Sequence, residues 1–163
     1  RAARAFREAI ALRPDRPEAY FNLGIALSQS AHHVEATQRL LEAKERFPVG
    51  SKVWAEAMAH AFYTLAHEAC GEVAKPEWGN DEGLKALSAR VVRAAPDDAH
   101  AQAMRAMVLS ARYGGWAAGP RSAAELREAA AHFERAAALC AALQMKAHFA
   151  SYADWCRAAS TTR

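Results

Sequence analysis

Apolar and polar residues follow a helical spacing through most of the chain. Residues 2–9 have the order Ala-x-x-x-Phe-x-x-Ala, which places the apolar side chains on one helix face, and Pro14 ends that helix. The same order returns in residues 36–43, before Pro48. No stretch of useful length alternates with the period of two that marks a strand. The pattern predicts an all-α chain of about eight helices.

The two copies of this pattern are related by one constant offset, the separation of Ala2 from Ala36, which indicates an internal repeat. The matched pairs are Ala2 and Ala36, Phe6 and Leu40, Ala9 and Ala43, Pro14 and Pro48, Ala19 and Val53, and Tyr20 and Trp54. Members of each pair have similar size or chemistry. So many matches at this repeat offset predict a structural unit that is built more than once.

Residues 17–50 resemble the tetratricopeptide repeat, a pair of helices called A and B. That repeat has an aromatic residue at position 4, Leu-Gly at 7 and 8, and an aromatic residue or Leu at 11, followed by Ala at 20, an aromatic residue at 24, Ala at 27 and Pro at 32. The chain has Tyr20, Leu23, Gly24, Leu27, Ala36, Leu40, Ala43 and Pro48 in those places. The resemblance implies a right-handed α-solenoid of helix hairpins, in which Gly24 and the alanines let helices A and B approach closely.

We expect one domain over residues 1–163, divided into successive units. The expected units are helix B of a truncated repeat (1–16), a well-matched repeat (17–50), an elongated repeat (51–98), an elongated divergent repeat (99–141) and a capping helix (142–163). The opening half-repeat indicates a cut from a longer array. The final helix would cover the apolar side of the last repeat.

The third and fourth units depart from the family pattern. In the third, Ala57 and Met58 replace Leu-Gly, helix A is expected from Ser51 to about Cys70, and helix B from Asp81 to Ala94. In the fourth, Gln102 and Arg105 do not fit positions 4 and 7, and helix A is expected to end at Gly114–Gly115. Ser122 and Glu125 have the spacing of a capping box, which predicts the start of the next helix.

Composition narrows the class of protein. The chain is 52% hydrophobic, but roughly 43 of its 163 residues are alanine, so large apolar side chains are scarce. The net charge of +3 is mild and scattered, which argues against nucleic acid as a partner. Glu56 and His60 interrupt the apolar segment 54–65, so no membrane insertion is expected. Three cysteines without a CxxC pair favour a reducing, intracellular compartment, with the organelle open.

Catalytic and metal-binding patterns are weak. The sequence has no phosphate-binding glycine loop, no Gly-x-Ser-x-Gly and no His-Glu-x-x-His. His67 and Cys70 are three residues apart, with His60 two turns earlier, but no second ligand pair completes a zinc site. We therefore expect no catalytic residue, no cofactor and no metal, and a protein that is not an enzyme.

The family resemblance implies a concave groove lined by helix A residues. The residues assigned to partner binding there are Phe21, Asn22, Ile25, Lys52, Glu56 and Tyr63, with Phe62, Met104 and Met107 beside them. Asn22 and Lys52 match the carboxylate clamp of chaperone-tail receptors, but Glu56 replaces the expected Arg and would repel a carboxylate. Such a surface suits an apolar or amphipathic segment of a protein partner. In the alternative, a helix of this chain fills the groove.

Two inserted loops each carry a tryptophan, Trp78 in KPEWGN and Trp116 in YGGWAAGP. Both loops connect a helix A to its helix B, so the two rings are expected on one edge of the solenoid. They would either contact a partner or fill their own widened helix pairs.

The sequence thus favours a non-catalytic module for protein–protein interaction or scaffolding, which binds a peptide segment or partner subunit through the groove or the loop edge. One alternative is the repeat arm of a larger enzyme, such as a transferase or hydroxylase, with its catalytic domain outside this chain. Another is a permanent subunit of a large assembly.

Overall fold

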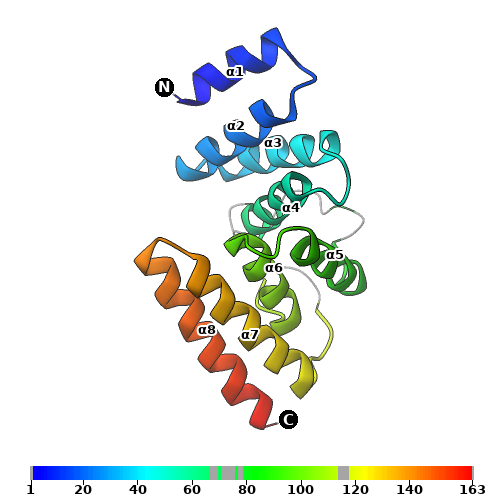
Figure 1. The fold of residues 1–163 in the computed structure, drawn as a ribbon, viewed down its shortest axis with the longest axis vertical. Coiled ribbons are helices and arrows are strands. Elements are labelled where there is room, and N and C mark those ends of the chain that lie inside the picture. Colours follow the sequence, from blue (N-terminus) through cyan, green and yellow to red (C-terminus); the bar gives the residue numbers. More distant parts are fainter. Residues whose placement is uncertain (1, 67–69, 71–75, 77–78, 114–117, 163) are drawn as a thin grey trace. The chain divides into compact units, whose positions relative to one another are not determined.

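The computed structural model describes residues 2–66, 70, 76, 79–113 and 118–162 (Figure 1). Within these residues the regular structure is helical and includes eight α-helices, which confirms the predicted all-α class. The chain divides into two units, Arg1–Ala74 and Lys75–Arg163, and each is described by itself.

The first unit contains four helices that pack in chain order. They are α1 (Ala2–Leu12), α2 (Pro17–Gln29), α3 (His33–Arg46) and α4 (Lys52–Leu65). Each contacts the next, and α2 also contacts α4. Ala3, Phe6 and Ile10 of α1 pack against a buried cluster that includes Leu23 and Leu27 of α2.

Helices α2 and α3 approach closely at Gly24. A Cβ atom placed on Gly24 would lie 2.6 Å from Cγ of Leu40 and 3.2 Å from the carbonyl oxygen of Ala36. Leu40, Ala36 and Ala43 are fully buried on α3. The expectation that Gly24 and the alanines permit close packing is therefore confirmed, because any side chain at position 24 would overlap the neighbouring helix.

The second unit also contains four helices that pack in chain order. They are α5 (Asp81–Ala94), α6 (Ala99–Ser110), α7 (Ala123–Leu139) and α8 (Leu143–Thr161). The predicted range of α5 and the capping box of Ser122 and Glu125 at the start of α7 are confirmed. The rings of Phe133 and Phe149 stack between α7 and α8 at 6.3 Å, and these two helices lie side by side (Figure 1).

Two helices end earlier than the sequence predicts. Helix α4 ends at Leu65 rather than near Cys70, and Cys70 is nevertheless buried, with its Sγ 3.7 Å from Oγ1 of Thr37. Helix α6 ends at Ser110 rather than at Gly114–Gly115, because Ala111 takes the left-handed conformation, with φ of 56°, that a glycine usually provides.

A helix, a proline turn and a second helix recur three times. Helices α1, α3 and α5 end at Leu12, Arg46 and Ala94, and the helices after them begin at Pro17, Lys52 and Ala99. Each turn contains a proline at the second position after the helix end: Pro14, Pro48 and Pro96. The first two copies are related by the repeat offset seen in the sequence, and the third follows after a longer interval.

In the first and third copies, a side chain of the second helix holds the turn through a hydrogen bond to the proline carbonyl. The Tyr20 hydroxyl donates a hydrogen bond to the carbonyl of Pro14 at 2.9 Å, and the Gln102 amide donates to the carbonyl of Pro96 at 2.7 Å. Tyr20 and Gln102 each occupy the fourth position of the helix that follows the turn. Gln102, which does not fit the sequence pattern at that position, thus makes the same bond as the aromatic residue it replaces.

The α2–α3 contact predicts the effect of a side chain at position 24. Replacement Gly24→Ala should raise helix propensity by about 1 kcal/mol but add a methyl group to a filled contact, for a net destabilisation of about 1 to 3 kcal/mol. Urea unfolding followed by circular dichroism measures this change. In a Leu40→Ala background the penalty should shrink, and an equal penalty in both backgrounds would show that the contact is not the cause.

Candidate functional site

The three predicted binding residues on α2 differ in exposure. Asn22 is exposed, whereas Phe21 and Ile25 are half-buried. The Phe21 ring meets the ring of Phe47 edge-on at 6.4 Å and that of His60 at 5.5 Å. Phe21 therefore joins α2 to α4 and to the end of α3, and only part of its surface is left for a partner.

The predicted residues on α4 are more deeply placed. Lys52 is exposed at the first position of the helix, Glu56 and Tyr63 are half-buried, and Phe62 is fully buried. In the second unit, Met104 is also fully buried. Phe62 and Met104 are thus part of the protein interior and are not accessible to a partner. Trp78 and Trp116 lie outside the described residues.

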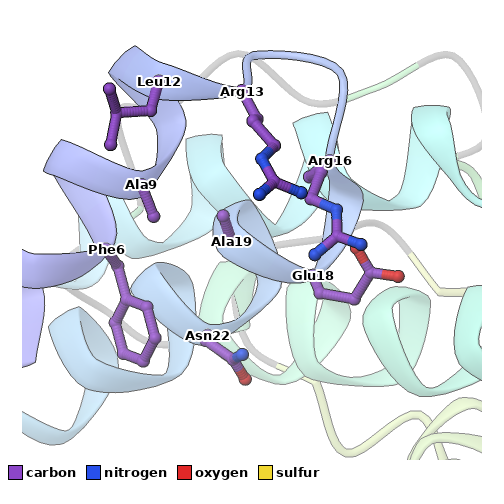
Figure 2. A pocket seen from close by; sticks show the side chains of 8 residues that line it. All are labelled: Phe6, Ala9, Leu12, Arg13, Arg16, Glu18, Ala19 and Asn22. Atoms are coloured by element: carbon purple, nitrogen blue, oxygen red, sulfur yellow. The ribbon is translucent and has the colours of Figure 1, made fainter.

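An open cavity of about 350 Å³ lies between α1 and α2 (Figure 2). It is lined by Phe6, Ala9, Leu12, Arg13, Arg16, Glu18, Ala19 and Asn22. The first three of these come from α1, the last three from α2, and the two arginines from the connection between the helices (Figure 2). The cavity therefore brings Asn22, a predicted binding residue, together with residues that precede the well-matched repeat.

This cavity combines an apolar wall with a charged end at which two arginines and the carboxylate of Glu18 lie (Figure 2). Leu12 is 83% exposed, and Ala9 is exposed although it belongs to the apolar pattern of α1. Arg13 and Arg16 are exposed at the end where α1 passes into α2.

In the second unit, Arg121 forms the centre of a buried polar network. Its guanidinium donates to Oδ2 of Asp81 at 3.0 Å, to the Val108 carbonyl at 2.9 Å and to the Tyr113 hydroxyl at 3.1 Å. The Arg121 side chain is only 2% exposed. These bonds join the start of α5, the end of α6 and the residues just before α7.

The network shifts the pKa values of its members. The hydrogen bond from Arg121 lowers the pKa of Asp81 to about 2, and burial raises the pKa of Tyr113 to about 12. The Lys85 ammonium, 2.8 Å from Oε1 of Glu125, lowers the pKa of Glu125 to about 2. All five groups therefore keep one protonation state near neutral pH, which suits a structural role rather than proton transfer.

A second polar contact joins α6 to α7. Since the Gln102 amide nitrogen donates to Pro96, its oxygen faces Nδ1 of His132 at 2.6 Å, and Nδ1 must carry the proton. Burial lowers the pKa of His132. The neutral ring thus completes the hydrogen bonding of Gln102.

Neither metal ligation nor membrane insertion has support in the described part of the chain. Among the described residues, no three His, Cys, Asp or Glu side chains converge on a point where a metal ion could bind. No described helix combines the length and the apolar character needed to cross a membrane.

Sequence reasoning missed both Arg13 with Arg16 and the Arg121 network. The repeat contained a signal for the first pair, because the repeat offset aligns Arg13 with Phe47 and Arg16 with Gly50. No short motif signals the second, since Asp81, Tyr113 and Arg121 are brought together only by helix packing.

Comparison with known proteins yields no assignment. No known family model matches the chain, and no curated protein matches it significantly.

The Arg121 network predicts how stability depends on pH. Because the folded pKa values of Asp81 and Glu125 lie below their ordinary values of 3.8 and 4.5, their stabilisation is complete above those values and disappears as the pH falls toward about 2. Asp81→Asn should lower the free energy of unfolding at pH 7 by about 2 to 4 kcal/mol, because Arg121 loses its charged partner. Denaturant unfolding of the parent chain and the variant at pH 7 and at pH 2.5 measures this effect. The difference between them should shrink at pH 2.5, and a constant difference would contradict this account.

Proposed function

We propose that this chain is a non-catalytic tetratricopeptide-type module, which binds a peptide segment or subunit of a protein partner or serves as a scaffold for it. The observation that carries the proposal is the threefold recurrence of a helix, a proline turn and a helix, with the first turn fastened by Tyr20 and the third by Gln102. A repeated helix pair buries one face on its neighbours and offers the other to a ligand.

The arrangement of the helix pairs is also part of this proposal. Successive helix pairs of this kind stack into a right-handed solenoid, and α8 would cap the last pair. The repeat offset that relates Pro14 to Pro48 within the first unit and the Gly24–Leu40 contact support that arrangement. The longer segments of the second unit, with α7 and α8 of 17 and 19 residues, are departures within the same scheme.

The proposed binding surface lies on α2 and α4 in the first unit. Asn22 and Lys52 provide exposed polar groups, and the half-buried Phe21, Ile25 and Tyr63 provide apolar surface between them. Glu56, half-buried on α4, adds a negative charge that disfavours a free carboxylate as the ligand. An amphipathic or apolar segment of a partner protein is the ligand class that fits these residues.

The polar clusters of the described residues support a non-enzymatic role. Arg121 with Asp81, and Gln102 with His132, use their hydrogen bonds to hold helix ends together. Their function in this proposal is to hold the helices of the second unit together.

Affinity purification from the source cells, followed by mass spectrometry, tests the proposed surface. The chain carrying Asn22→Ala with Ile25→Asp should capture its principal partner at least tenfold more weakly, which corresponds to about 1.4 kcal/mol. Its helical circular dichroism should stay unchanged, because Asn22 is exposed and Ile25 is only half-buried.

A matched variant controls for nonspecific effects. Gln38→Ala with Val34→Asp makes the same two kinds of change at exposed positions of α3 and should leave capture intact. Equal capture by both double variants would remove the α2 surface from the binding site.

A further inference from the structure

Arg112, just after the end of α6, lies against the side of α8 in the second unit. It follows Ala111, whose left-handed conformation ends α6, and it is half-buried. The central carbon of its guanidinium lies 4.5 Å from the ring centre of Tyr152 and 4.7 Å from that of Trp155. A guanidinium over aromatic ring faces is attracted to them, so the two rings hold the cation in place.

The hydrogen-bond donors of Arg112 distinguish it from the other arginines that are at least half-buried. Three such arginines in the described ranges each pair with a carboxylate: Arg39 with Glu42, Arg105 with Glu128, and Arg121 with Asp81. The guanidinium of Arg112 has no hydrogen-bond or ion-pair acceptor among the residues that the structure describes. Its contacts with the two rings engage its charge and leave its N–H groups unused.

The aromatic residues around Arg112 are themselves accessible and carry further donors. Tyr152 is half-buried, and Trp155 is 43% exposed. The ring of His148, also exposed, stacks on that of Tyr152 at 6.1 Å. In the described part of the chain, neither the Tyr152 hydroxyl nor the Trp155 indole N–H meets an acceptor. These four residues, called the Arg112 cluster, thus combine ring surface with hydrogen-bond donors.

The cluster lies on the side of α8 next to the end of α6. The buried face of α8 consists of Phe149, Ala153, Cys156 and Ser160. On one side of that face Trp155 meets Arg112, and on the other side Arg157 pairs with Glu134 of α7. Two separate elements of the second unit therefore build the cluster, and it is more than the outer surface of a single helix.

A carboxylate is the group that best completes this arrangement. The planar guanidinium of an arginine binds a carboxylate through two parallel hydrogen bonds, and a guanidinium stacked on an aromatic face can still form them. Trp155 beside it offers apolar surface to a neighbouring side chain. Trp, Tyr and Arg are also the residue types that contribute most to the binding energy of protein interfaces.

We propose that the Arg112 cluster binds the side-chain carboxylate of an Asp or Glu in a peptide segment of a partner protein. Arg112 donates both hydrogen bonds to that carboxylate, and an apolar side chain next to it in the peptide packs on Trp155. The cluster shares no residue with the surface proposed on α2 and α4, so it goes beyond the proposed function and does not depend on it.

A small peptide with one carboxylate tests this site. The tetrapeptide Ala-Glu-Leu-Ala, acetylated and amidated at its ends, has a side-chain carboxylate and no terminal one. Titrated into the ¹⁵N-labelled full chain, it should shift the Nε–H resonance of Arg112 and the Nε1–H resonance of Trp155 until they saturate. One ion pair and one apolar contact bind weakly, so the titration covers the millimolar range. The analogue with Gln in place of Glu should bind at least tenfold more weakly.

Variants of the chain separate recognition by Arg112 from loss of the fold. Arg112→Gln should bind the glutamate peptide at least tenfold more weakly, followed at the Trp155 resonance. Arg112→Lys keeps a cation over the rings but lacks the planar pair of donors, so its affinity should lie between those of the parent and the Gln variant. Arg127→Gln removes a charge from an exposed position of α7 and should leave binding unchanged. Circular dichroism checks that each variant is folded.

Several results would overturn the proposal. They are the lack of a saturable shift with the glutamate peptide, equal affinity for the Glu and Gln peptides, and equal binding by the parent and both Arg112 variants. Tighter binding of inorganic phosphate would assign the cluster to a phosphate group. Shifts that grow with the concentration of the chain alone would assign it to a second copy.

The outcomes for the two binding surfaces are independent. Weaker partner capture with Asn22→Ala and Ile25→Asp concerns the surface on α2 and α4, and the peptide titration concerns the Arg112 cluster. If the titration fails while that double variant still weakens capture, the proposed function stands and only the carboxylate site is lost.

Discussion

The close approach of α2 and α3 at Gly24 is the constraint on which the rest of the first unit depends. With no side chain at position 24, the Leu40 side chain and the Ala36 carbonyl can lie against the α2 backbone. That approach sets the separation of the two helices, and the separation decides which residues of each helix are buried. Phe6 of α1, which stands one repeat offset before Leu40, packs against α2 and also lines the cavity between α1 and α2.

Because the helices pack through small residues, polar groups fix the positions of the helix ends. Alanines dominate the interior, and they hold neighbouring helices closely without the interlocking that larger side chains provide. At the turns, hydrogen bonds fix the positions of the helix ends instead. Tyr20 and Gln102 each bind the carbonyl of a proline, and Arg121 joins the ends of three helices. Within each unit, a few polar contacts thus hold the ends of the helices.

The sequence predicted the helical class, the range of α5 and the capping box of α7, because these features arise from local patterns of apolar spacing and capping residues. It misplaced the end of α6, since Ala111 adopts a left-handed conformation without the glycine that would announce it. It could not assemble Asp81, Tyr113 and Arg121, which are separated in sequence and meet only in the folded chain. The sequence does contain a signal for the cavity, because Arg13 occupies the position at which the next copy has Phe47.

The central claim is that α1 and α2 repeat the packing of α3 and α4 with one open face. A crystal structure of the chain tests it most directly. The account predicts that α1–α2 superposes on α3–α4 in the register that places Ala2 on Ala36 and Pro14 on Pro48. Phe6 should then pack on α2, and Ala9 and Arg13 should be open to solvent. A structure in which α1 packs through Ala9 and Arg13, or in which the two pairs superpose in another register, would contradict it.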